Sequence, residues 1–206
     1  MRTVDAFADL RRFGKPVLTT EDAADRLGAT RSAASRTLGR LAAQGLVLPI
    51  RHGLWSMDLE LDPLALPEYL TAPLPAYVSL QSALFLHGLI SQVPQVIYAV
   101  SLAATRRVST TLGTFSIHRM APEFFGGYRQ DGTTQVKLAT PEKALLDVLY
   151  LSPARSRLFG SLPELELPPR FSLRECRRWI ARIPARYRRT MVTHRLEGIL
   201  GRAGAG

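Results

Sequence analysis

The 206-residue chain has little of what membrane, secreted and disulfide-linked proteins depend on. Its single cysteine, Cys176, excludes an internal disulfide and a zinc site built on several cysteines. No apolar run approaches the roughly 18 residues of a membrane-spanning helix. Asp5 and Asp9 interrupt the segment where a signal peptide would have its apolar core. These absences predict a cytoplasmic protein with no membrane partner.

Metal and cofactor signatures are also missing. His52, His118 and His194 have no ligand spacing with one another or with Cys176. The pair Gly126-Gly127 is typical of a turn and lacks the surroundings of a phosphate-binding loop. We therefore expect no bound metal and no cofactor.

Residue types used in catalysis occur without a catalytic pattern. Ser79, His87 and Asp147 could be imagined as a triad, but they lie on separate predicted helices and lack a nucleophile-elbow motif. Glu142-Lys143 resembles a fragment of some nuclease motifs, which also need an aspartate on a nearby strand. None is evident, so the sequence predicts a protein that is not an enzyme, with a nuclease as a weaker alternative.

Positive charge is what the chain has in excess, and it is unevenly placed. The formal net charge is +10. Residues 1–57 hold nine Arg and Lys against five Asp and Glu, and residues 170–206 hold ten against two, whereas residues 58–169 are slightly acidic. Two basic ends around a near-neutral middle indicate one or two surfaces that face a polyanion.

The segment Thr19–Met57 has the order of a winged helix-turn-helix. Thr19 or Thr20 can cap a short helix, Gly28 supplies a turn, and a second helix runs from about Thr30 to Gln44. Within it, Ala34, Leu38 and Leu41 recur at the spacing of one buried helical face.

The opposite face of that second helix has hydroxyls and guanidinium groups. These side chains donate to phosphates, and arginine can also bond a guanine edge in the major groove. A solvated polar face is the alternative, but the helix order around it favours duplex DNA. The predicted DNA-binding residues on this helix are Thr30, Arg31, Ser32, Ser35, Arg36 and Arg40.

A wing is expected to follow the helix. Leu46–Leu48 and Leu54–Met57 read as paired strands, with Pro49–Gly53 as the turn between them. Arg51 is placed to reach a phosphate or the minor groove, with His52 as a donor beside it. Trp55 is expected in the core beneath the wing, and a stacking role is the alternative.

The predicted fold class is α+β, with three segments. A winged helix-turn-helix occupies residues 1–57, a proline-rich connector residues 58–76, and a mixed α/β domain with a small, mainly antiparallel sheet residues 77–206. Ser79 is expected to cap one helix of that domain, and Ser172 with Glu175 to form a capping box for another.

Two basic helices are predicted at the end of the second domain. They could bind an acidic partner or a nucleic acid, or their charge could simply be solvated. The predicted basic surface comprises Arg174, Arg177, Arg178, Arg182, Arg186, Arg188 and Arg189.

Motifs in the second domain resemble the antitoxin family called AbiEi. They are Tyr77–Leu84, His87–Ile90, Val93-Pro94, Phe115–Arg119, Phe125–Tyr128 and Ala139–Asp147. The resemblance covers about residues 15–150. It implies the antitoxin of a type IV toxin–antitoxin system, which represses its own operon at repeated operator sites and counteracts a nucleotidyltransferase-like toxin.

The expected partners are therefore double-stranded DNA and such a toxin. Two copies could bind paired half-sites, although no strong heptad seam is visible. A stand-alone regulator without a toxin is the alternative.

Overall fold

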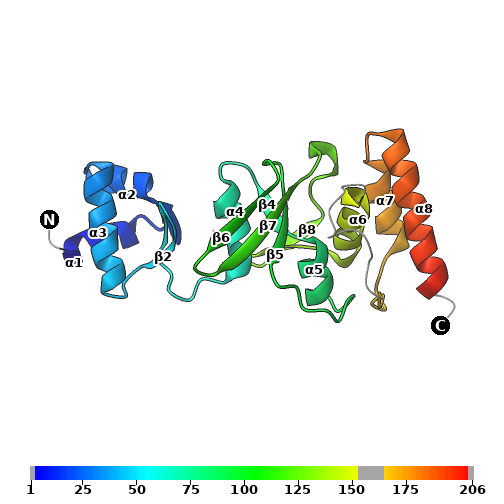
Figure 1. Cartoon of the computed structure of the whole chain (residues 1–206), viewed down its shortest axis with the longest axis horizontal. Coiled ribbons are helices and arrows are strands. Elements are labelled where there is room, and N and C mark those ends of the chain that lie inside the picture. Colours follow the sequence, from blue (N-terminus) through cyan, green and yellow to red (C-terminus); the bar gives the residue numbers. More distant parts are fainter. Residues whose placement is uncertain (1–2, 153–164, 204–206) are drawn as a thin grey trace. The chain divides into compact units, whose positions relative to one another are not determined.

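The computed structural model describes residues 3–152 and 165–203 of the chain. It divides into two compact units (Figure 1). One comprises the chain up to Pro63 together with residues 109–113, and the other comprises the remaining residues. Both units combine helices with a sheet, so the predicted α+β class is confirmed.

The N-terminal unit packs three helices with a three-stranded antiparallel sheet of order β1-β3-β2. Leu10, Leu18, Leu38 and Leu41 are fully or almost fully buried between them. The elements are α1 (Thr3–Arg12), β1 (Val17–Thr19), α2 (Thr20–Leu27), α3 (Arg31–Ala43), β2 (Leu48–Arg51) and β3 (Leu54–Ser56).

Local hydrogen bonds set the start of α2 and α3. The Thr19 hydroxyl accepts from the Asp22 amide, and the Asp22 carboxylate accepts from the Thr19 amide, so a capping box begins α2. Gly28 ends α2 in the left-handed conformation, at φ 57°. Thr30 then caps α3 by accepting from the Ala33 amide.

The hairpin between β2 and β3 is tighter than the sequence predicted. The first strand begins at Leu48 and continues through Arg51, which leaves only His52 and Gly53 for the turn. Ile50, expected in the turn, is fully buried and draws this stretch into the sheet. Pro49 is tolerated because β2 is an edge strand, and the pairing register shifts just after it.

Residues 58–76, which the sequence predicts to be a proline-rich connector, contain two short helical elements. They include a 3-10 turn at Pro63–Ala65 and helix α4 (Leu66–Thr71). Leu66 and Leu70 are buried, and the Thr71 hydroxyl donates to the Pro67 carbonyl at 3.0 Å. Proline at the start of α4 removes no helical hydrogen bond, so it did not prevent a helix here.

The second unit is built on a six-stranded mixed sheet of order β6-β7-β5-β4-β9-β8. Strands β4 and β9 are parallel, as are β5 and β7, whereas β4–β5 and β8–β9 are antiparallel. These four pairings are divided equally between parallel and antiparallel, and the parallel β4–β9 pair brings together strands that lie far apart along the chain. The strands are β4 (Ala76–Val78), β5 (Ile97–Ser101), β6 (Arg106–Thr110), β7 (Gly113–Arg119), β8 (Tyr128–Gln130) and β9 (Lys137–Ala139).

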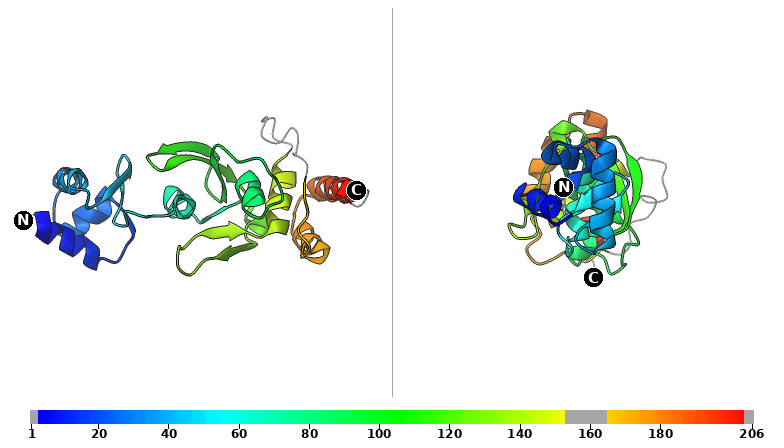
Figure 2. Two further views of the ribbon diagram at one scale, coloured as in Figure 1. Left: turned by 90° about the horizontal axis from the view of Figure 1, so that it is seen from below. Right: turned by 90° about the vertical axis from the view of Figure 1, so that its left-hand side faces the viewer.

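Besides α4, four further helices of the described residues belong to this unit. They are α5 (Leu80–Leu86), α6 (Pro141–Leu151), α7 (Leu173–Ala181) and α8 (Arg186–Ala203). Helix α6 is central, and α7 and α8 pack beside it (Figures 1 and 2). A 3-10 turn at Pro122–Phe124 lies between strands β7 and β8. No helix of the described ranges has the length and apolar character needed to span a membrane.

Candidate nucleic-acid interface

Helix α3 separates a buried face from an exposed, hydrogen-bonding face. Ala34, Leu38 and Leu41 are completely buried. Since residues three and four apart share a helix face, the polar residues between them point outward. The six residues predicted to bind DNA on this helix are all exposed: Thr30, Arg31, Ser32, Ser35, Arg36 and Arg40.

Most of these side chains are not committed to the fold. Arg36 has no hydrogen bond or ion pair with any residue that the structure describes. Arg40 donates only a long hydrogen bond of 3.4 Å to the Thr37 hydroxyl. Arg31 lies 3.6 Å from the Glu21 carboxylate, with both side chains largely exposed. Thr30 differs, because its hydroxyl oxygen caps the helix. The arginine groups can therefore turn to a phosphate without breaking a buried contact.

The hairpin presents a second polar site. Arg51 at the end of β2 and His52 in the turn are both exposed. Trp55 packs against the core and donates its indole N–H to the Thr20 hydroxyl at 3.0 Å. Trp55 thus links the hairpin to the core and to α2, in agreement with its expected place in the core.

The second unit contains a polar network that is buried in its core. Lys143 and Asp147 on α6 form an ion pair whose side chains are both 0% exposed. Asp147 also accepts from the Ser79 hydroxyl at 2.7 Å and from the Tyr77 hydroxyl at 3.0 Å. Lys143 donates to Tyr77 at 3.0 Å. The sequence missed this network, although the i, i+4 spacing of Lys143 and Asp147 was a usable signal.

Burial dominates the titration of this network. It raises the pKa of Asp147 and lowers that of Lys143, because an apolar core disfavours both charged forms, while their mutual attraction opposes these shifts. Burial also raises the pKa of Tyr77 well above 10.0, and the Asp147 charge adds to the effect. The hydroxyl of Tyr77 therefore stays protonated and serves as a donor.

This network corrects two sequence expectations. The Ser79 side chain makes no capping bond to α5, because its hydroxyl donates to Asp147 instead. Lys143, part of the nuclease-like pair, is enclosed in the core and faces no solvent. Its partner in that pair, Glu142, accepts from the Ser172 amide at 2.8 Å.

The helix start at Ser172 is also built differently. The Ser172 hydroxyl accepts from the Glu175 amide as expected. The Ser172 amide, however, donates to the Glu142 carboxylate on α6, whereas in a capping box it would donate to Glu175. Glu142 thereby ties the start of α7 to α6.

His87 does not join Ser79 and Asp147 in a triad. Its Nε2 lies 2.7 Å from the Ala139 carbonyl oxygen, whereas Ser79 and Asp147 are bonded to each other. Within the described residues, no group of three or more His, Cys, Asp or Glu side chains is arranged to hold a metal ion.

The segment with the exposed helix face has a known counterpart. Residues 6–57 match the family described as transcriptional regulator, AbiEi antitoxin. The match spans from α1 to the end of the β2–β3 hairpin, and confirms over that segment the resemblance predicted from the sequence. No curated protein matches the chain.

Outside the AbiEi-like segment, the seven predicted basic-surface arginines do not form one uniform face. Arg178 and Arg182 line a pocket, whereas Arg177 and Arg189 line a different hollow between α7 and α8. Arg188 is half-buried, with its guanidinium 4.6 Å from the Tyr150 ring centre. The remaining two, Arg174 and Arg186, are exposed.

Arg189 is partly committed to the fold. Two of its nitrogens donate to the Ile183 carbonyl, at 3.1 Å and 2.7 Å, and so close the connection between α7 and α8. A helical plot of α7 and α8 could not separate these roles, because they depend on what packs against each helix.

Proposed function

We propose that residues 1–57 form a winged helix-turn-helix that binds duplex DNA, and that the protein is a cytoplasmic transcriptional repressor. In this proposal α3 enters the major groove and the β2–β3 hairpin is the wing. The observation that carries it is the polar face of α3, where Ser32, Ser35, Arg36 and Arg40 are all exposed. The AbiEi family match over the same segment supports it.

The recognition helix is tested by fluorescence anisotropy on DNA from upstream of the protein's own gene. We expect Arg36→Ala or Arg40→Ala to weaken binding to the preferred site by about 1–3 kcal/mol, if the arginine reads a base. Arg12→Ala is the matched control, since Arg12 is an exposed arginine of the same unit that pairs with Asp9 on α1. Unchanged affinity after both α3 changes, at low and physiological salt, would remove the assignment of α3.

The wing is expected to behave differently from α3. A phosphate contact carries no sequence information. Arg51→Ala should therefore weaken binding to preferred and unrelated DNA alike, and reduce the slope of log affinity against log salt by about 1. Loss confined to the preferred site would instead show that Arg51 reads a base.

We further propose that the protein acts as the antitoxin of a type IV toxin–antitoxin system. It would repress its own operon at repeated operator sites, with two copies on paired half-sites, and counteract a nucleotidyltransferase-like toxin. Footprinting upstream of its gene tests autoregulation, and the mass of the complex on one and two repeats gives the number of copies bound.

The toxin is tested by co-expression with the product of the neighbouring gene. Growth arrest by that product alone, relieved by this protein, supports the antitoxin role. Footprinting without any such rescue would leave a stand-alone regulator, which is the alternative function.

A further inference from the structure

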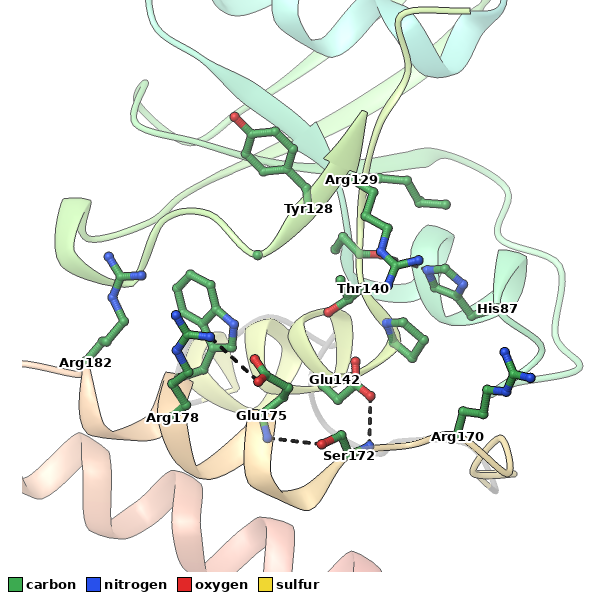
Figure 3. A pocket seen from close by; sticks show the side chains of 15 residues that line it. His87, Tyr128, Arg129, Thr140, Glu142, Arg170, Ser172, Glu175, Arg178 and Arg182 are labelled. Atoms are coloured by element: carbon green, nitrogen blue, oxygen red, sulfur yellow. Dashed lines mark hydrogen bonds and ion pairs between the residues drawn. The ribbon is translucent and has the colours of Figure 1, made fainter. Parts of the chain in front are cut away.

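The second unit contains a pocket that none of the roles above uses. Its volume is about 770 Å³, within the range of small-molecule sites. Strand β8, the end of α5, the start of α6 and helix α7 supply its walls (Figure 3). Each wall comes from the same compact unit, so the pocket is a property of that unit alone.

Four arginines from three parts of the chain line this pocket. Arg129 is on β8, Arg170 precedes α7, and Arg178 and Arg182 are on or at the end of α7. Figure 3 shows Arg129, Arg170 and Arg178 around the hollow. All four are exposed. Of these four, only Arg178 and Arg182 belong to the basic surface predicted from the sequence.

The carboxylates in the pocket pair with only one of these four arginines. Glu142 accepts the Ser172 amide and lies near no arginine at salt-bridge distance in the described residues. Glu175 faces only Arg178, at 3.7 Å. Within the described ranges, no carboxylate lies within 4.0 Å of Arg129, Arg170 or Arg182. The lining therefore has four guanidinium groups against two carboxylates, and this net positive charge favours an anionic ligand.

Aromatic side chains form part of the wall. The Arg182 guanidinium lies 4.6 Å from the centre of the half-buried Trp179 ring, and Tyr128 is held by stacking on Tyr77 at 5.0 Å. Gly127 packs so closely that an added Cβ would lie 2.8 Å from the Trp179 indole. Trp179 and Tyr128 are thus fixed in place beside the arginines.

We propose that this pocket binds a phosphorylated small molecule of nucleotide size. Guanidinium groups match phosphate oxygens in pairs, and several of them at one pocket favour a compact ligand with several negative charges, such as a di- or triphosphate. The aromatic walls suit a planar base next to those phosphates. An extended nucleic acid would instead need a groove running past the pocket. This proposal does not depend on DNA binding by the first unit.

Calorimetry on the full chain tests the site with GTP, ATP, pyrophosphate and inorganic phosphate as separate ligands. We expect a nucleoside triphosphate to bind, and to bind more tightly than pyrophosphate or phosphate. The double change R178Q and R182Q should weaken triphosphate binding by about tenfold or more, because charge-assisted contacts are lost.

The matched control is R174Q and R177Q. Arg174 and Arg177 are exposed on helix α7 and do not line this pocket. Their substitution removes the same amount of charge as the R178Q and R182Q pair. They should change the affinity by no more than about twofold, because only a distant, screened charge is lost. An equal loss in both pairs would overturn the pocket in favour of a diffuse basic surface, as would a single-stranded oligonucleotide that binds more tightly than the triphosphate.

Fluorescence gives a second, local measurement. The chain has two tryptophans, so Trp55→Phe leaves Trp179 as the only one. Bound nucleotide should change the Trp179 emission with the same dissociation constant as calorimetry. No heat and no emission change at millimolar triphosphate would reject the proposal, even if DNA binding by the first unit were intact.

Discussion

The two units use charge in opposite ways. In the N-terminal unit, no charged side chain of the described residues is buried. The arginines of α3 lie on its exposed side, and the apolar residues of the same helix form part of the core. In the second unit, Lys143 and Asp147 are enclosed in the core and bonded to Tyr77 and Ser79. The first unit thus keeps its charged side chains out of the core, whereas the second unit has exposed arginines and also an ion pair enclosed in its core.

The largest effect is expected from breaking the buried Lys143–Asp147 ion pair. Asp147→Ala leaves the Lys143 ammonium without its carboxylate in the core, so we expect the free energy of unfolding to fall by about 3–5 kcal/mol. Chemical denaturation in a Trp55→Phe background measures this, because Trp179 then reports on the second unit alone.

A double change separates the pair from its surroundings. Replacing both partners, with Lys143→Met and Asp147→Leu, should cost less than the Asp147→Ala change alone, because no unpaired charge remains. If Asp147→Ala cost less than about 1 kcal/mol, as a surface pair does, the network would have no structural role.

The next comparison uses one glycine from each unit with nearly the same backbone angle. Gly53 in the hairpin turn has φ +76° and open space around it, whereas Gly127 has φ +74° and a Cβ there would meet Lys143 and Trp179 at 2.8 Å. Gly53→Ala should cost about 1–2 kcal/mol from the left-handed backbone. Gly127→Ala adds overpacking, for about 2–5 kcal/mol in total. Denaturation followed by the fluorescence of Trp55 and of Trp179 measures the loss of unfolding free energy in each variant. Equal losses in the two variants would contradict the overpacking expected at Gly127.

The smallest expected effect concerns the capping box of α2. Burial acts to raise the pKa of Asp22, but hydrogen bonds from Lys15 and Thr19 outweigh it and hold the pKa below its ordinary value of 3.8. The folded state therefore binds this proton less readily than the unfolded state. The stabilisation is present above about pH 4 and is lost as the pH falls through the lowered pKa.

Asp22→Asn tests this pH dependence. At pH 7 the variant should be less stable by about 1 kcal/mol, in the range of a lost cap. The difference from the unchanged protein should shrink as the pH falls below about 4. Denaturation at a series of pH values, followed at Trp55, measures it, and a difference that stays constant down to pH 2 would show that the carboxylate charge is not involved.

Local sequence was a good guide where local hydrogen bonds and periodicity decide the structure. Thr19 and Thr30, at the predicted helix starts, cap their helices by accepting from a backbone amide three residues on. The apolar spacing of α3 placed Ala34, Leu38 and Leu41 in the core, and left its arginines outside. These features need only neighbours within one or two helical turns.

Prediction was weaker where a distant segment competes for a side chain. Ser79 has the sequence position of a cap, but Asp147, 68 residues later, takes its hydroxyl. Glu142 replaces Glu175 at the Ser172 amide for the same reason. The hairpin turn was expected to be too long, because only the packed core shows that Ile50 is buried.

By itself, the sequence determined the two basic ends, the helices of the N-terminal unit and the exposed arginines of α3, because helical periodicity and capping act over a few residues. Tertiary structure alone decided the mixed strand order, the burial of Lys143 with Asp147, and the meeting of Arg129, Arg170, Arg178 and Arg182 at one pocket. Those arrangements join residues up to 70 positions apart. Which distant groups meet depends on the packing of the whole unit, and no spacing along the chain encodes it.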